Sequence, residues 1–209
     1  WCNPHNPTGR MWTAQELTKV AKIVEKYNLW IISDEIHCDL TKPGTEYIPF
    51  ASVDDTCRDI SVTCIAPTKT FNLAGLQTAA VYAENSILHH RMWRQLNTDE
   101  VAEPNAFAIQ ATIAAFQYGE EWLDELREYV EKNKQYVTEF LQEKIPLIHP
   151  VAGDATYLMW LDCRDLGLSN EALHDFMIQK AKLGLNDGCA FGRSLNGYMR
   201  LNAACPRSI

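Results

Sequence analysis

The chain has 209 residues, of which 46% are apolar and 22% are charged, and this composition is typical of a globular protein with a substantial core. Its formal net charge of −8 and its pI near 5.2 argue against a nucleic-acid partner, because an acidic surface repels the phosphate backbone. No stretch reaches the roughly 18 consecutive apolar residues of a membrane span, so we expect no membrane partner either.

The cysteines and the two chain ends bear on where the protein acts. The number of cysteines, seven, is odd, and no C-x-x-C pair is present, which favours reduced thiols in the cytoplasm over a disulfide framework or a zinc site. The chain opens on Trp1 without a starting Met, and it ends at Ile209 just after a Pro-Arg-Ser run that resembles the start of a helix. We therefore expect a fragment that lacks sequence at both ends.

The first elements in chain order predict an α/β unit. Thr13 and Glu16 have the spacing of a capping box, and apolar residues follow at helical spacing, which predicts an amphipathic helix over residues 14–27. The apolar run at 29–32 then predicts a buried strand that is reached by a short turn. Asp34 follows this strand at its C-terminal edge.

Two further strands and three helices are predicted next. Residues 60–65 and 79–83 have the composition of short strands in the same sheet, and a polar loop that contains a lysine and a glycine separates them. The periodicity of apolar residues then predicts three helices, and we expect the last of them to bridge two domains. These helices cover residues 85–96, 105–118 and 120–144.

Beyond Pro146 the pattern is that of a small α+β domain. The pattern predicts, in order, a strand, a helix and two more strands. Their ranges are 155–161, 170–183, a region near 185–190, and 197–202.

The chain therefore divides into two predicted domains. Residues 1–119 form a partial large domain, and residues 120–209 form a small C-terminal domain that is incomplete at its end. No linker rich in Pro, Gly or Ser separates them, so the two domains are expected to pack closely. We expect Trp122 and Trp160 to belong to the core rather than to a site.

Three short motifs contain residue types that can carry chemistry. The first is Asn-Pro-His-Asn-Pro-Thr-Gly at 3–9, the second is Ser-Asp-Glu-Ile-His at 33–37, and the third is Ala-Pro-Thr-Lys-Thr-Phe-Asn-Leu-Ala-Gly at 66–75. Taken singly, they have structural interpretations, namely a turn, a solvated strand end and a surface lysine. Their order and spacing along the predicted elements are more informative than any one of them.

In this order the motifs resemble those of the fold-type-I pyridoxal-phosphate enzymes, the aminotransferase class I/II family, and the lysine motif is most similar to that of the cystathionine β-lyase, or C–S lyase, group. The resemblance covers essentially the whole chain. It implies an α/β fold, with part of the aminotransferase-like PLP-dependent transferase large domain followed by a small α+β C-terminal domain. It also implies pyridoxal 5'-phosphate as the cofactor, an amino acid as the small-molecule substrate, and a homodimer in the full-length protein.

The resemblance assigns a role to each cofactor-binding residue. Lys69 would bind the cofactor aldehyde through its amine and later act as the catalytic base. Asp34 would face the pyridine nitrogen and keep it protonated, and Asn6 would donate to the phenolic oxygen of the ring. His37 stands where many aminotransferases carry Tyr. The hydroxyl of Thr68 suits a phosphate oxygen.

One residue of the small domain is assigned to the substrate. Arg200 matches the position that grips the substrate α-carboxylate, and a planar guanidinium can pair with both carboxylate oxygens at once. Phe191 resembles part of a loop that closes over substrate, although it also suits the core. Two departures affect the phosphate site: Ala66 stands where many members have Ser, and Gln77 stands where an aminotransferase carries a phosphate-binding Arg.

Three functions remain open from the sequence. The first is PLP-dependent β-elimination at the Cβ–S bond of cystathionine or a related cysteine conjugate, which gives a thiol, pyruvate and ammonia. The second is transamination of an amino acid, and the third, from another class, is a non-catalytic fragment that binds a regulatory protein. His37 and Gln77 favour the lyase over the aminotransferase. The family's phosphate-binding turn and ring-stacking aromatic come from sequence before Trp1, so the fragment alone is expected to bind cofactor weakly or not at all.

Overall fold

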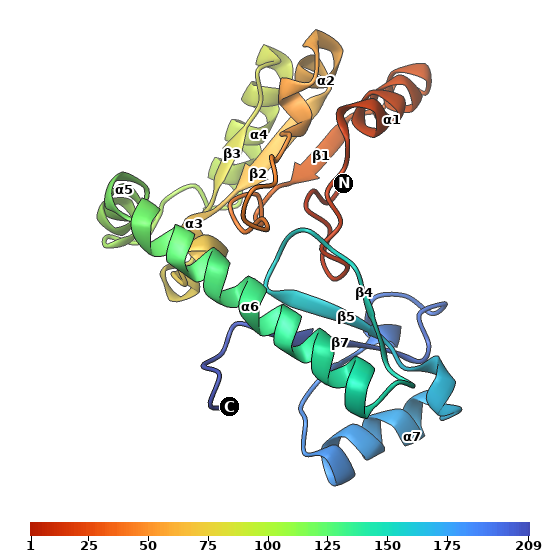
Figure 1. Ribbon diagram of the computed structural model, residues 1–209. Helices are drawn as coiled ribbons and strands as arrows, with labels where there is room; N and C mark the ends of the chain where they lie inside the picture. The colour runs from red at the N-terminus through yellow and green to blue at the C-terminus, as the bar shows by residue number, and fades with distance from the viewer.

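The computed structural model describes all residues from 1 to 209. Two separate sheets make up the fold, and the long helix α6 runs from α3 and α5 along the second sheet (Figure 1). No helix is both long and apolar enough to cross a bilayer. The helices are α1 (Ala14–Lys26), α2 (Asp55–Asp59), α3 (Pro67–Thr70), α4 (Ser86–Thr98), α5 (Ala108–Tyr118), α6 (Glu120–Lys144) and α7 (Asn170–Asp175). The strands are β1 (Ile31–Asp34), β2 (Ser61–Ile65), β3 (Ala80–Tyr82), β4 (His149–Val151), β5 (Leu158–Asp162), β6 (Asn186–Asp187) and β7 (Tyr198–Asn202).

The first sheet has the order β1-β2-β3 and confirms that the first three predicted strands share one sheet. β1 and β2 are parallel, and β3 is antiparallel to β2. Helices α1 and α2 pack on the face that bears Ile31, and α4 packs on the face that bears Val62. Because β1 and β2 are parallel, their carboxyl ends meet at one edge, where Asp34 stands opposite Cys64.

Helix α1 forms for the reasons that the sequence indicates. The backbone N–H of Glu16 donates to Thr13 Oγ1 at 3.3 Å, and the backbone N–H of Thr13 donates to Glu16 Oε2 at 3.0 Å, so the predicted capping box is confirmed. The predicted apolar stripe is buried against the first sheet. Its buried members are Leu17, Ala21 and Val24.

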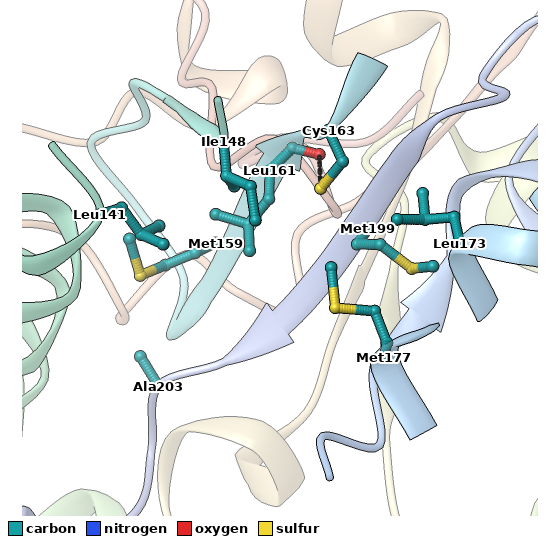
Figure 2. Packing of buried hydrophobic residues seen from close by; sticks show 9 residues of the cluster. All are labelled: Leu141, Ile148, Met159, Leu161, Cys163, Leu173, Met177, Met199 and Ala203. Atoms are coloured by element: carbon teal, nitrogen blue, oxygen red, sulfur yellow. Dashed lines mark hydrogen bonds between the residues drawn. The ribbon is translucent and has the colours of Figure 1, made fainter. Parts of the chain in front are cut away.

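The second sheet has the order β4-β5-β7-β6 and is antiparallel throughout. Its core joins α6, β5, β7 and α7, whose apolar side chains converge between the sheet and the helices (Figure 2). Because α7 and α6 cover the same sheet, this core binds the C-terminal elements into one unit. The cluster consists of Leu141, Ile148, Met159, Leu161, Cys163, Leu173, Met177, Met199 and Ala203.

Backbone hydrogen bonds connect the two sheets through segments that are far apart in the sequence. The N–H of Ala155 donates to the carbonyl of Gly9 at 3.0 Å, and the N–H of Thr156 donates to the carbonyl of Leu40 at 2.7 Å. A third bond runs from the N–H of Lys42 to the carbonyl of Asp154, at 2.7 Å. We call residues 8–9, 40–42 and 153–156 together the joint.

Two glycines allow the close approach of chains in the joint. A Cβ atom on Gly153 would lie 2.2 Å from the carbonyl oxygen of Thr8, and one on Gly9 would lie 2.5 Å from that of Ala155. Gly9 also has a φ of +69°, which is readily adopted only without a side chain. A side chain at either glycine would therefore push the two sheets apart.

Helix α6 contacts both parts of the molecule, as a bridging helix should. Near its start, the Trp122 ring lies 6.0 Å from the Phe71 ring, measured between centroids. In its first half, Arg127 Nε donates to the carbonyl oxygen of Thr41 at 2.9 Å. Near its end, Leu141 belongs to the hydrophobic core of the second sheet. The domain boundary between residues 119 and 120 stays a prediction.

The two tryptophans expected in the core differ in their surroundings. Trp160 is 4% exposed, which confirms the expectation for this residue. Trp122 is 47% exposed, so the same expectation is wrong for it. The reason is that Phe71 covers only part of its ring, at the outer end of α6.

Several predicted boundaries are corrected by the pairing of strands. β1 starts at Ile31, where pairing with β2 begins, and not at residue 29, since Leu29 and Trp30 are 55% and 49% exposed. The strand predicted at 155–161 is β5, Leu158–Asp162, because Thr156 has a φ of +65° and cannot extend the strand.

Other corrections concern short segments. The loop predicted around Lys69 is the short helix α3, in which Pro67 occupies the first turn, a start signal for helices. The helix predicted at 170–183 is α7 followed by a π-helical segment, Phe176–Ala181. The strand predicted near 185–190 is limited to β6, because a 3-10 turn follows at Gly188. Strands rarely contain Pro, so β4 was missed, and it tolerates Pro150 as an edge strand.

The hydrophobic core of the second sheet should be sensitive to loss of side-chain volume at Leu173, which is 1% exposed. We expect Leu173→Ala to lower the free energy of unfolding by about 3 kcal/mol, because it removes buried carbon atoms and leaves a cavity. Urea unfolding followed by tryptophan fluorescence measures this. The matched control is Leu168→Ala, since Leu168 is 39% exposed and should change the free energy by less than about 0.5 kcal/mol. Equal losses in both variants would contradict the burial of Leu173 in this core.

Candidate active site

The carboxyl edge of the first sheet holds the first group of predicted site residues. Asp34 is the last residue of β1; its Oδ1 accepts from the N–H of Ile36 at 3.2 Å, and its side chain is exposed. The neighbouring strand β2 ends at Ile65 and leads directly into α3. Parallel pairing therefore brings Lys69 to the edge at which Asp34 stands.

Helix α3 is anchored by the residue next to Lys69, while Lys69 itself forms no ion pair. Thr70, which is fully buried, donates from Oγ1 to Asp39 Oδ2 at 2.9 Å and so ties α3 to the segment that follows β1. Lys69 is exposed and takes part in none of the ion pairs of the structure. Its amine is therefore available to another group at this edge.

Arg200 reaches the first motif from the second sheet. It lies on β7, and its Nη1 donates to Oδ1 of Asn6 at 2.9 Å. Asn6 lies three residues before Gly9, and the carbonyl of Gly9 accepts the hydrogen bond from the N–H of Ala155 in the joint. The same backbone contacts that connect the sheets thus set the distance between Arg200 and the first motif.

Further contacts orient the guanidinium of Arg200. Its Nη2 donates to Asn186 Oδ1 at 2.9 Å, and its carbon atom lies 4.8 Å from the centre of the Phe191 ring. Nε is buried and has no hydrogen-bond partner. Because a guanidinium has five N–H groups, it keeps donors for an anionic ligand after these contacts are made.

His37 is buried among the charged residues of the site. It is 3% exposed, and its Nδ1 has no hydrogen-bond partner. Burial lowers the pKa of His37 to about 4; the carboxylate of Asp34 opposes this effect, while the positive charges of Lys69 and Arg200 act in the same direction as burial. The imidazole is therefore neutral at pH 7 and lies close to all three charges.

The structure thus gathers most of the predicted site residues into one region. Asp34, Lys69 and Arg200 all influence His37, and Asn6 is hydrogen-bonded to the arginine. Thr68 is half-buried on the helix that carries the lysine, but no hydrogen bond joins its side chain to the others. The roles assigned to these residues remain predictions.

Two residues near the site were missed from the sequence. The ring of Tyr157 lies 5.8 Å from that of His37 in an edge-on arrangement, and burial raises the pKa of Tyr157 while the charge of Arg200 opposes this. No motif marks Tyr157. Asn186 stands opposite Arg200 in the pairing of β6 with β7, and only the register of these strands could have revealed it.

Comparison with known proteins places the chain in a family. A family model described as aminotransferase class I and II matches residues 1–208. The chain belongs to this family. The match confirms the resemblance drawn from the three motifs, and with the structural similarity below it confirms the expected fold class, a partial aminotransferase-like fold.

Relatives within the aminotransferase class I and II family include lyases. The cystathionine β-lyase PatB of Bacillus subtilis (strain 168) is 42% identical over 204 residues, a match that covers 98% of this chain and 53% of PatB. Protein MalY of Escherichia coli (strain K12) is 35% identical over 208 residues, covering 99% of this chain and 53% of MalY. The crystal structure of cystalysin from Treponema denticola, described as containing pyridoxal 5'-phosphate, has a TM-score of 0.95 at 35% identity and covers 99% of this chain and 52% of cystalysin. The chain spans about half the length of the curated relatives it matches.

The lowered pKa of His37 can be measured directly. In an NMR titration of this chain, the imidazole of His37 should change protonation near pH 4, well below the ordinary value of 6.5. A midpoint near 6.5 would show that the imidazole is solvated rather than buried.

The same pKa shift predicts how stability depends on pH. The unfolded chain takes up the proton near pH 6.5 and the folded chain only near pH 4, so the free energy of unfolding should fall by roughly 3 kcal/mol as pH is lowered through this interval and level off below it. His37→Gln should remove this part of the pH dependence, whereas His89→Gln, at an exposed position, should leave it intact.

Proposed function

We propose that the whole protein is a PLP-dependent carbon–sulfur lyase that acts on cystathionine or a related cysteine conjugate. The observation that carries the proposal is the hydrogen bond between Arg200 and Asn6, because it brings a guanidinium from the second sheet to the edge that holds Lys69 and Asp34. A primary amine, a carboxylate and a guanidinium around one site suit an amino-acid substrate. The description of PatB as a cystathionine β-lyase supports a lyase activity for the whole protein.

The residues of this chain fit pyridoxal 5'-phosphate. When bound, the cofactor supplies an aldehyde that an amine can capture and a ring that withdraws electrons from the substrate Cα. Lys69 would hold the aldehyde, Asp34 the ring nitrogen, and Asn6 and His37 the side of the phenolic oxygen, with Thr68 toward the phosphate. The fit is supported by the unpaired amine of the lysine and by the buried Nδ1 of the histidine, which lacks a partner.

The chain's own residues account for substrate orientation and proton transfer. Arg200 binds both oxygens of the substrate α-carboxylate, which fixes the Cα–H bond relative to the first sheet. The amine of Lys69 then takes up the Cα proton. Loss of the β-substituent as a thiolate leaves a product that water converts to pyruvate and ammonia, so the reaction consumes one water and needs no second substrate.

Transamination by the same groups is the second candidate. It would require return of a proton without loss of the β-substituent, followed by reaction with a keto acid. Gln77, in place of an arginine, favours the lyase; it is exposed at the end of a 3-10 turn. A purely binding function is the third, and it predicts no cofactor absorption at all.

Assembly, location and domain boundary are also part of the proposal. The exposed apolar residues of α5, including Ile109 and Phe116 at 54% and 52%, support a homodimer of the whole protein. Free cysteines without a disulfide suit a cytoplasmic protein. The presence of two separate sheets supports the proposed division into a partial large domain, residues 1–119, and a small domain, residues 120–209.

Borohydride reduction of the whole protein loaded with cofactor should attach a pyridoxyl group to Lys69, as read by peptide mapping. Lys69→Gln should abolish labelling and activity, because no other amine lies on α3 at this edge. Lys19→Gln is the matched control, since Lys19 is also an exposed lysine but lies on a different helix, α1. Recovery of the label on a different lysine would refute the assignment.

The reaction type can be decided by product analysis. With cystathionine as substrate, the whole protein should release pyruvate and a free thiol continuously without an added keto acid, because elimination restores the enzyme in every cycle. Pyruvate is followed with lactate dehydrogenase and thiol with a chromogenic disulfide. A reaction that stops after one turnover, and resumes only with 2-oxoglutarate, would identify an aminotransferase instead.

A further inference from the structure

Asn186 stands directly opposite Arg200 in the antiparallel pair of β6 and β7. Side chains of such a pair project from the same face and lie close together. Here Oδ1 of Asn186 accepts from Nη2 of Arg200 at 2.9 Å. We propose that Asn186 is a positioning residue that holds this guanidinium in the orientation needed to bind the carboxylate of the substrate. The inference rests on the proposed function, in which Arg200 binds that carboxylate.

The chemistry of the two asparagines explains how they orient the arginine and leave it available. Asn6 occupies one N–H of Nη1, and Asn186 occupies one N–H of Nη2. One N–H remains on each of these nitrogens, in addition to that of Nε. Both acceptors are neutral amide oxygens, so they fix the plane of the guanidinium and do not neutralise its charge. An acidic residue at position 186 would compete with the substrate for this charge.

Asn186 is itself held in place, which a positioning residue requires. Strand β6 has only two residues and lies at the edge of the second sheet. The next residue, Asp187, is bonded through Oδ2 to His174 Nδ1 of α7 at 2.9 Å. After it, the backbone of Gly188 packs so closely that a Cβ atom there would lie 2.2 Å from the carbonyl oxygen of Leu195. Contacts of the two residues that follow Asn186 therefore fix the strand that carries it.

The test measures carboxylate binding apart from catalysis. Propionate carries a carboxylate and no amine, so its dissociation constant for the whole protein loaded with cofactor, measured by calorimetry, reports on carboxylate binding without reaction of an amine. Asn186→Ala should weaken propionate binding by about tenfold, because a hydrogen bond to a charged group is lost. Asn186→Asp should weaken it by about a hundredfold, and added salt should reduce that loss. Asn202→Ala, on the same strand as the arginine, is the matched control and should bind as the unaltered protein does.

Steady-state kinetics separates positioning from a general structural role. Asn186→Ala should raise KM for the sulfur amino acid by about tenfold and change kcat by less than about twofold, whereas a damaged fold would lower kcat as well. Unchanged propionate binding and KM in Asn186→Ala, an equal loss in Asn202→Ala, or no propionate binding by the unaltered protein would each overturn the inference. Binding of propionate that depends on Asn186, in a protein that releases no pyruvate, would support the inference and contradict the proposed function.

Discussion

The fixed relation between the two sheets is the constraint on which the candidate site depends. Asp34 lies at the end of β1 in the first sheet and Lys69 lies on α3, which follows β2 of the same sheet, whereas Arg200 lies in the second sheet. Local structure therefore does not bring the arginine to the other two residues. The backbone bonds of the joint do so, through Gly9 and Ala155 above all. Backbone contacts are well suited to this task, because their geometry is set by peptide units and not by side chains that can change rotamer.

Neutral polar groups, and no opposite charges, contact the arginine of the site. Asn6 and Asn186 contact the guanidinium of Arg200 through amide oxygens, and burial keeps His37 uncharged at pH 7. None of the ion pairs in the structure includes the amine of Lys69 or the carboxylate of Asp34. Opposite charges that lay in direct contact would satisfy one another and leave little affinity for a ligand. A scaffold that keeps them apart instead preserves their attraction for the charges of an incoming amino acid.

The sequence was sufficient for those features that depend on local chemistry. Helix α1 followed from a capping box and an apolar stripe, and the grouping of Asp34 with Lys69 was expected from the resemblance of their motifs to those of a family. Features that depend on long-range register could not be obtained in this way. The opposition of Asn186 to Arg200 and the contact of Tyr157 with His37 arise from pairings in the folded chain, and neither leaves a mark in the sequence of its own segment.

The backbone character of the joint has a consequence for how substitutions are tolerated along the chain. Most positions of the joint contribute N–H and carbonyl groups, which almost any amino acid supplies equally well. Gly9 and Gly153 are different, because a Cβ atom at either would meet the opposite backbone at 2.5 Å or less. A saturation library over these segments should therefore accept fewest variants at these two glycines and at the buried positions Leu40, Ala155 and Thr156. Selection on the joint would act on the absence of a side chain at the two glycines and on side-chain size at its buried positions.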